Sequence, residues 1–240
     1  GIVAALPPHL LSAEDASKAV KMKDMSIDIG FPVDRVKELV EVGDLITFNS
    51  PLVSMLGSYV NGKSIDDRAG IVMLVEVMKH LDRLKYQAQV SCVATVQEEV
   101  GTRGAIIGTY RAEPDIGIAI DVTHGDTPDA PKDFTHDMDK GIVVAMGPNM
   151  HPGLTQRVLD TAKEYGLDCQ IEVAPRATGT DARSMQISRA GVPTILVQIP
   201  LRYMHTTVET LNMDHISKGA RLVALFIASL KEGWQEWLSY

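Results

Sequence analysis

Four acidic side chains and one histidine stand where apolar segments of the sequence end. These candidates for metal binding or catalysis are Asp66, Glu98, Glu99, Asp121 and His205. Functional groups in α/β sheets lie just beyond the carboxyl ends of strands, so we expect these side chains to converge at one sheet edge. Carboxylates gathered there repel one another unless something neutralises them, and a divalent metal ion would do so.

Each candidate also has a simpler explanation when taken alone. Asp67 is a good N-cap for a following helix, and Asp66 could serve nearby. Glu98 and Glu99 could lie in a solvated loop, while Asp121 could begin a turn. Taken together, carboxylates with a single imidazole suit zinc, cobalt or manganese better than a thiolate-rich structural site would.

The elements that would position these residues alternate between helix and strand. Apolar spacing predicts helices over residues 68–84, 155–165, 182–190 and from about 213 to 234. Apolar, β-branched runs predict strands over residues 89–96, 116–120, 142–145, 171–173 and 194–199. This alternation predicts an α/β sheet with helices on both faces.

Two regions differ in character. Residues 1–57 contain short strand-like stretches and too little apolar material to stand alone, so we interpret them as part of a small β-rich module. Residues 58–240 carry the alternating pattern and every candidate residue.

Composition narrows the class of protein. The 240 residues are 45% hydrophobic and 22% charged, with a net charge of −8, so we expect no nucleic-acid or anionic-membrane partner. No apolar run reaches the roughly 20 residues that span a bilayer. The two cysteines, Cys92 and Cys169, fit no zinc motif or disulfide framework, which favours reduced thiols and a cytoplasmic location.

Five segments, in order, resemble one known family. They are Gly62-Lys63-Ser64-Ile65-Asp66-Asp67-Arg68-Ala69-Gly70, Gln97-Glu98-Glu99-Val100-Gly101-Thr102-Arg103-Gly104-Ala105, Asp121-Val122-Thr123-His124-Gly125-Asp126-Thr127-Pro128, Gly179-Thr180-Asp181-Ala182 and Ile199-Pro200-Leu201-Arg202-Tyr203-Met204-His205. This series resembles the tetrahedral aminopeptidases, also called deblocking or glutamyl aminopeptidases and often mislabelled as endoglucanases. Any one segment is weak evidence, but all five in the family's order are specific.

The resemblance implies a fold and an activity. The fold would be zinc-exopeptidase-like, with a mixed, mostly parallel sheet between helices and part of a β-rich dimerisation domain. The activity would be removal of N-terminal residues from short peptides, by a water that bridges two divalent metal ions, zinc or cobalt. The partners would be peptide substrates and further copies of the chain, assembled from dimers into a tetrahedral dodecamer.

The resemblance also assigns a role to each matching residue. Asp66 would bridge the two metals, and its peptide bond to Asp67 would be cis. Glu98 would be the general base, Glu99 and His205 would bind one metal, and Asp121 the other. Asp181 and Arg202 would lie at the substrate pocket.

One expected ligand has no counterpart in residues 1–240. The family carries a further metal-binding histidine in an "AH-x-DE" segment, so we expect a preceding segment of roughly a hundred residues to supply it. Without that segment, an edge of the sheet and apolar surface would be exposed. Two alternatives stay open: an inactive or non-catalytic assembly subunit of the same fold, and a glycoside hydrolase with two catalytic carboxylates.

Overall fold

The computed structural model describes residues 1–4 and 6–239, which form two compact units, Gly1–Thr47 and Phe48–Tyr240. The sequence predicts a boundary at residue 57, and the structural division falls earlier. The reason is a hairpin: β3 (Val53–Ser54) pairs antiparallel with β4 (Tyr59–Gly62). This pairing places residues 48–57 in the larger unit.

The smaller unit holds little regular structure. Strand β1 (Ile2–Ala4) pairs antiparallel with β2 (Ser26–Asp28), and α1 (Val33–Leu39) follows. Three single-turn 3₁₀ helices join them: η1 (Pro8–Leu10), η2 (Asp15–Ser17) and η3 (Met22–Asp24). Many of its large apolar side chains are exposed, among them Phe31 and Ile46.

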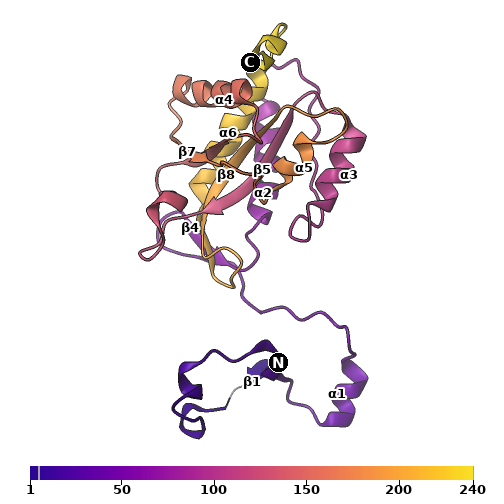
Figure 1. Ribbon diagram of the computed structural model, residues 1–240, viewed down its shortest axis with the longest axis vertical. Coiled ribbons are helices and arrows are strands. Elements are labelled where there is room, and N and C mark those ends of the chain that lie inside the picture. Colours follow the sequence, from indigo (N-terminus) through magenta and orange to yellow (C-terminus); the bar gives the residue numbers. More distant parts are fainter. Residues whose placement is uncertain (5, 240) are drawn as a thin grey trace. The chain divides into compact units, whose positions relative to one another are not determined.

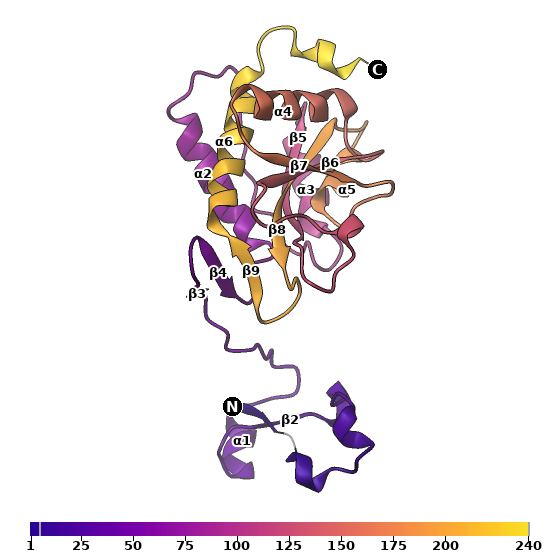
Figure 2. The same ribbon diagram turned by 90° about the vertical axis from the view of Figure 1, so that its left-hand side faces the viewer.

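The larger unit is built on one mixed sheet with strand order β3-β4-β9-β8-β6-β7, and β5 pairs with β8. The remaining strands are β5 (Gly117–His124), β6 (Ile142–Met146), β7 (Cys169–Val173), β8 (Thr194–Arg202) and β9 (Glu209–Asn212). Helices pack on both faces of this sheet (Figures 1 and 2), so the predicted α/β class is confirmed.

Strand directions show where the sheet is parallel. β5 runs parallel to β8 and β6 parallel to β7, whereas β6 and β9 each run antiparallel to β8. Residues 203–208, which connect β8 to β9, are too few for the crossover that parallel neighbours need. Parallel pairing is therefore confined to part of a sheet that the sequence predicts to be mostly parallel.

In the described part of the larger unit, five α-helices cover the sheet. They are α2 (Arg68–Leu81), α3 (Arg103–Ala112), α4 (Pro152–Glu164), α5 (Asp181–Gln186) and α6 (Met213–Ser229), with single-turn helices η4 (Lys132–Phe134) and η5 (Trp234–Leu238). Helices α2, α4 and α6 lie on one face, and α5, with α3 against it, lies on the other (Figures 1 and 2). The predicted helix 182–190 ends early, at Gln186, and the predicted helix 213–234 ends at Ser229.

Alternation along the central strand separates the two cores. Ile195, Val197 and Ile199 of β8 belong to the larger core with α2, α4 and α6, while Leu196 packs in the smaller core with α5. This period of two is what a strand buried on both faces requires. The next inward position on the α5 side is Gln198, which is 3% exposed and lies opposite Asp121 of β5.

The predicted strand over residues 89–96 is wrong: in the structure, this segment pairs with no strand of the described chain. A strand needs a partner for its main-chain hydrogen bonds, and β-branched composition does not supply one. A cavity of about 930 Å³ is lined by residues of this segment and by Ile116 together with residues 117–121 of β5. Among the described strands, β5 pairs only with β8, so its other edge is open.

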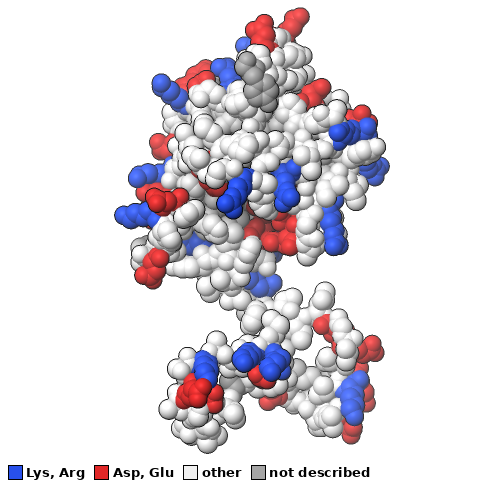
Figure 3. All heavy atoms as spheres, in the orientation of Figure 1, with Lys and Arg blue, Asp and Glu red and all other residues white. Residues whose placement is uncertain are grey.

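Acidic and basic side chains are both present on the surface of this chain (Figure 3). In Figure 3, basic side chains on the visible face are interspersed with acidic ones. Within residues 1–4 and 6–239, no helix has the length and hydropathy needed to cross a membrane. Cys92 is exposed and Cys169 is partly buried, and both are free thiols.

The core makes a direct prediction. Phe226 of α6 is fully buried, so replacing it with alanine should lower the free energy of unfolding by about 3–5 kcal/mol through lost burial and a cavity. Phe134 is 74% exposed, and Phe134→Ala should change the value by less than about 0.5 kcal/mol. Urea unfolding of both variants measures this, and equal losses would contradict the described core.

Candidate metal centre

Three side chains of different elements meet at one end of the sheet. Asp66 lies between β4 and α2, Glu99 follows the segment 89–96, and His205 follows β8. The His205 Nε2 atom is 3.1 Å from Asp66 Oδ2 and 3.5 Å from Glu99 Oε2. One ligand atom from each of the three lies within 4.8 Å of the others, a spacing that could hold a metal ion.

Asp67 combines a local role with its place in the cluster. The peptide bond joining Asp66 to Asp67 is cis. The Asp67 carboxylate also caps α2, since its Oδ1 accepts from Gly70 N at 2.9 Å. A Cβ at position 70 would come within 2.3 Å of Asp67 Oδ2, so this close approach requires glycine.

Asp121 and Glu98 face the same space. Asp121 lies within β5, is 8% exposed, and accepts from Val122 N at 2.7 Å. The cavity beside β5 is lined by Asp66, Asp67, Glu98, Glu99, Asp121 and Asp181. The structure therefore gathers all the predicted acidic residues around one cavity, with His205 in contact with two of them.

Burial and mutual repulsion raise the pKa values of four carboxyl groups in the cluster. Burial, followed by the charge of Asp67, raises the pKa of Asp121 to about 9. Burial is also the first cause at Asp67, with a pKa of about 8, and at Glu98, with a pKa of about 7. Burial and the charge of Glu99 raise the pKa of Asp66 to about 6, although nearby His205 opposes the rise.

These raised pKa values indicate that a positive charge would stabilise the ionised form of the cluster. Carboxyl groups this close avoid ionising together unless a positive charge joins them. Divalent cations supply that charge, and carboxylate oxygens with one imidazole nitrogen form a donor set suited to zinc or cobalt. The donor chemistry of the described residues therefore fits a divalent metal.

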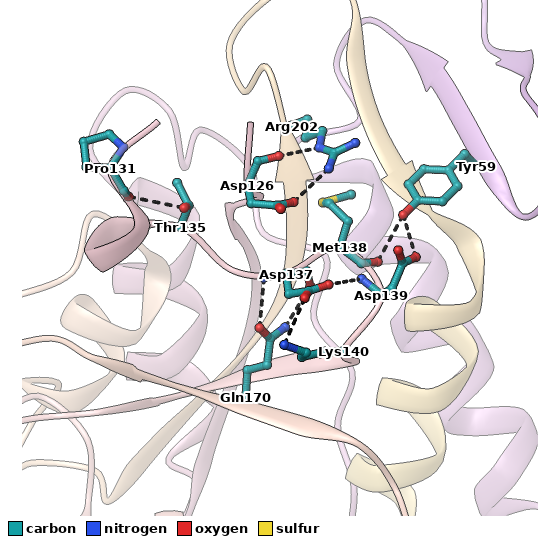
Figure 4. Close-up of polar contacts among 10 residues, drawn as sticks. All are labelled: Tyr59, Asp126, Pro131, Thr135, Asp137, Met138, Asp139, Lys140, Gln170 and Arg202. Atoms are coloured by element: carbon teal, nitrogen blue, oxygen red, sulfur yellow. Dashed lines mark hydrogen bonds and ion pairs between the residues drawn. The ribbon is translucent and has the colours of Figure 1, made fainter. Parts of the chain in front are cut away.

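The two predicted pocket residues are placed differently. Asp181, at the start of α5, lines the cavity and accepts from Thr95 Oγ1 at 2.6 Å. Its Oδ1 atom is buried without a hydrogen-bond partner in the described part of the chain. The Arg202 side chain is instead occupied by Asp126, with Nη2 2.8 Å from Oδ1 (Figure 4), and Arg202 does not line the cavity.

The loop that contains Asp126 is tied down at several points. Gln170 of β7 donates to the Asp137 carbonyl at 3.0 Å, and Tyr59 of β4 donates to the Asp139 carboxylate at 2.7 Å (Figure 4). Burial and the bond to Asp139 raise the pKa of Tyr59 to about 12, so this phenol stays protonated at neutral pH. The Arg202–Asp126 pair thus joins β8 to a loop that is also bound to β4 and β7.

The sequence prediction missed Glu209. This residue of β9 is 2% exposed and accepts main-chain hydrogen bonds from Ile65, Asp66 and His205. One signal was available: a glutamate begins the otherwise uncharged run Glu209–Asn212, four residues after His205. A charge in a strand-forming run indicates either solvent or a fixed set of donors.

Fold and site together define an α/β protein with a carboxylate–histidine cluster at one end of its sheet, in an arrangement that could hold a metal ion. The chain belongs to the M42 glutamyl aminopeptidase family, whose sequence model matches residues 1–222.

Similar proteins agree with this assignment. The lysyl aminopeptidase of Pyrococcus furiosus is 33% identical over 234 residues, which cover 96% of this chain and 67% of that protein. A TET aminopeptidase from a marine sediment thaumarchaeote superposes with a TM-score of 0.89 at 31% identity, covering 100% and 69% of the two chains. The TET1 peptidase of Pyrococcus horikoshii gives a TM-score of 0.80 at 30% identity, covering 95% and 68%. The chain thus spans about two thirds of the length of these relatives.

The raised pKa values predict how the metal-free protein responds to pH. The Asp121 carboxyl holds its proton to about pH 9 when folded, whereas an unfolded aspartate loses it near about pH 4. Its contribution to stability is therefore complete below about pH 4 and is lost as pH rises toward and through the folded pKa. We expect the free energy of unfolding, measured with urea in EDTA, to fall between about pH 5 and pH 9.

The aspartate variants isolate this effect. Asp121→Asn removes one titrating group and should make the fall shallower, leaving the part due to Asp66, Asp67 and Glu98. Asp160→Asn, a change at an exposed position on α4, should follow the parent curve. Identical curves for Asp121→Asn and the parent protein would contradict the described burial of Asp121.

Proposed function

We propose that this chain is the catalytic part of a metal-dependent aminopeptidase that removes N-terminal residues from short peptides. The observation that carries the proposal is the meeting of Asp66, Glu99 and His205 beside Glu98, around a cavity, in a member of the M42 family. The proposal has three parts: dependence on a metal ion, hydrolysis of the first peptide bond, and short peptides as substrates.

The proximity of the donor atoms supports one set of ligands: Asp66, Glu99 and His205 would hold one divalent ion, zinc or cobalt. By the family resemblance, Asp66 and Asp121 would hold a second ion. Support for the second position comes from the electrostatic coupling of Asp121 to Asp66 and from their shared cavity.

Glu98 is the general base in this proposal. Divalent metal ions at the site supply Lewis acidity toward a carbonyl and make a water a stronger nucleophile. The Glu98 carboxylate takes the proton of the attacking water and returns it to the leaving amine. In the metal-free chain, burial and the charge of Glu99 raise the pKa of Glu98 to about 7. Bound cations would lower it, which favours the carboxylate form that a base needs.

Asp181 is the group proposed to restrict cleavage to the chain end. A free N-terminus carries a positive charge, which a buried carboxylate with an unused oxygen can pair. Asp181 Oδ1 is such an oxygen, and Asp181 lines the same cavity as Glu98. Arg202 keeps a supporting role, because Asp126 already occupies its guanidinium group.

The glycoside hydrolase alternative has weaker support. Sugar-binding clefts present aromatic faces, and Trp234 is the single aromatic residue among the described residues that line this cavity. The non-catalytic subunit alternative predicts the same fold without turnover, and the Glu98 experiment below decides it.

We further propose a cytoplasmic location and assembly into a tetrahedral dodecamer built from dimers. Two free thiols support a reducing compartment. Exposed apolar side chains of the smaller unit support assembly, since soluble proteins rarely leave many such groups in water. A solved relative, PhTET1, is a dodecamer.

The assembly predicts a mass and a sensitive position. Mass photometry should find particles twelve times the 26.1 kDa chain, as in that dodecameric relative. Phe31→Glu, at a side chain 56% exposed in the smaller unit, should shift the particles to smaller species. Ile187→Glu, at a side chain 71% exposed in the larger unit, is the matched control and should not. A monomeric parent protein would contradict the assembly.

The catalytic assignment predicts the behaviour of a Glu98 variant. Glu98→Gln keeps the shape of the side chain but cannot accept the proton, so kcat on aminoacyl p-nitroanilides should fall by about 10²–10⁴-fold. Zinc content, measured by mass spectrometry of the metal, should stay at the parent value because Glu98 is not a proposed ligand. EDTA should abolish the activity of the parent protein, and zinc or cobalt should restore it.

Two controls complete this test. Glu164→Gln, at an exposed position at the end of α4, should leave kcat unchanged. N-acetylated substrates should resist cleavage. A parent protein that binds zinc yet cleaves no free-amine substrate would favour the non-catalytic subunit, and release of sugars from cellulose would favour the hydrolase of glycosides.

A further inference from the structure

Glu209 is a buried carboxylate that takes no part in the proposed mechanism. It begins β9 and is 2% exposed. Removing a carboxylate from water costs free energy unless hydrogen bonds replace its hydration. A charge kept in such a place therefore indicates a set of donors that needs it.

The donors are main-chain groups of the two loops that carry metal-site residues. Glu209 Oε2 accepts from Ile65 N at 2.5 Å and from Asp66 N at 3.1 Å. Glu209 Oε1 accepts from His205 N at 2.9 Å. Each oxygen of one carboxylate thus binds the main chain of one loop, an arrangement we call the Glu209 bridge.

The sheet explains why this residue can reach both loops. β9 pairs antiparallel with β4, which sets Glu209 opposite Gly62, just before the chain turns toward Asp66. β9 also pairs antiparallel with β8, whose end leads into His205. Glu209 therefore stands between the two exits from the sheet.

The loops need such an anchor because their backbone is unusual. Ser64, Tyr203 and His205 adopt positive φ angles of 55°, 59° and 62°. Residues with a Cβ seldom occupy this region, so surrounding bonds must hold them there. The side chains of Asp66 and His205 meet at 3.1 Å only while both backbones keep these positions.

We propose that Glu209 is a positioning residue that sets the separation of the Asp66 and His205 donor atoms by fixing the main chains of both loops. Its effect on metal affinity rests on the proposed metal site, whereas its effect on the two backbones does not. Glu209 acts through the ligands and touches no substrate.

Glutamine at position 209 tests this directly. Its amide keeps the volume and one acceptor oxygen, but its NH₂ group would face a main-chain N–H donor, so one arm of the bridge must break. Glu209→Asp is the second variant, since it keeps the charge while its shorter side chain cannot span both loops.

Glu172 provides a matched control. Its Oε2 atom accepts from Thr123 Oγ1 at 2.8 Å and from Gln198 Nε2 at 2.9 Å, in the same sheet. These donors are side chains and do not belong to the loops of Asp66 or His205. Glu172→Gln therefore removes a partly buried charge without cutting the Glu209 bridge.

The experiment combines amide hydrogen exchange of the metal-free full chain with a zinc titration. In both Glu209 variants, peptides covering residues 63–67 and 203–206 should exchange at least about 10-fold faster, since lost bonds raise local opening. Zinc affinity should fall by about 10–100-fold, as for other residues that orient metal ligands. Glu172→Gln should change neither value.

Two outcomes would overturn the inference. One is unchanged exchange of both loops in a folded Glu209 variant, and the other is parental zinc affinity in that variant. If the parent protein binds no zinc, the proposed function fails, and the exchange measurement alone still decides whether the bridge fixes the loops.

Discussion

Like charges gathered at one end of the sheet are the constraint on which the site depends. Asp66, Asp67, Glu98 and Asp121 are partly or largely withdrawn from water, and burial is the first cause of every raised pKa among them. Without a nearby positive charge, Asp67 and Asp121 keep their protons at neutral pH, because their pKa values are about 8 and about 9. A divalent ion would exchange those protons for a fixed charge, so metal binding, protonation and stability are coupled.

The backbone that holds this charge together is itself held from outside the cluster. Positive φ angles at Ser64 and His205 shape the loops on either side of the ligands. The main-chain N–H groups of Ile65 and His205 donate to Glu209, so this buried carboxylate fixes the geometry of the loops that carry the proposed ligands. The proposed ligands themselves differ in burial, since Asp121 is 8% exposed and the Glu99 side chain is 55% exposed.

The cavity beside β5 gives the site its chemical environment. Its walls combine the acidic cluster with aliphatic residues of β5 and of the segment 89–96. Apolar walls lower the local dielectric, which strengthens both the repulsion between carboxylates and the attraction of each to a cation. The edge of β5 that does not pair with β8 has no partner among the described strands.

The sequence by itself determined the α/β class and the helix 68–81, because these depend on local periodicity. It also determined which acidic residues surround the cavity, because residue type marks them. The tertiary structure alone decided which of these acidic residues contact one another. The segment 89–96 has strand composition but no ladder partner, and Arg202 is bound by Asp126 from another loop. The partners of Glu209 became visible only in the structure, through bonds to residues 144 and 143 positions earlier in the chain. Such contacts are set by how strands pair across the sheet, and no local pattern records them.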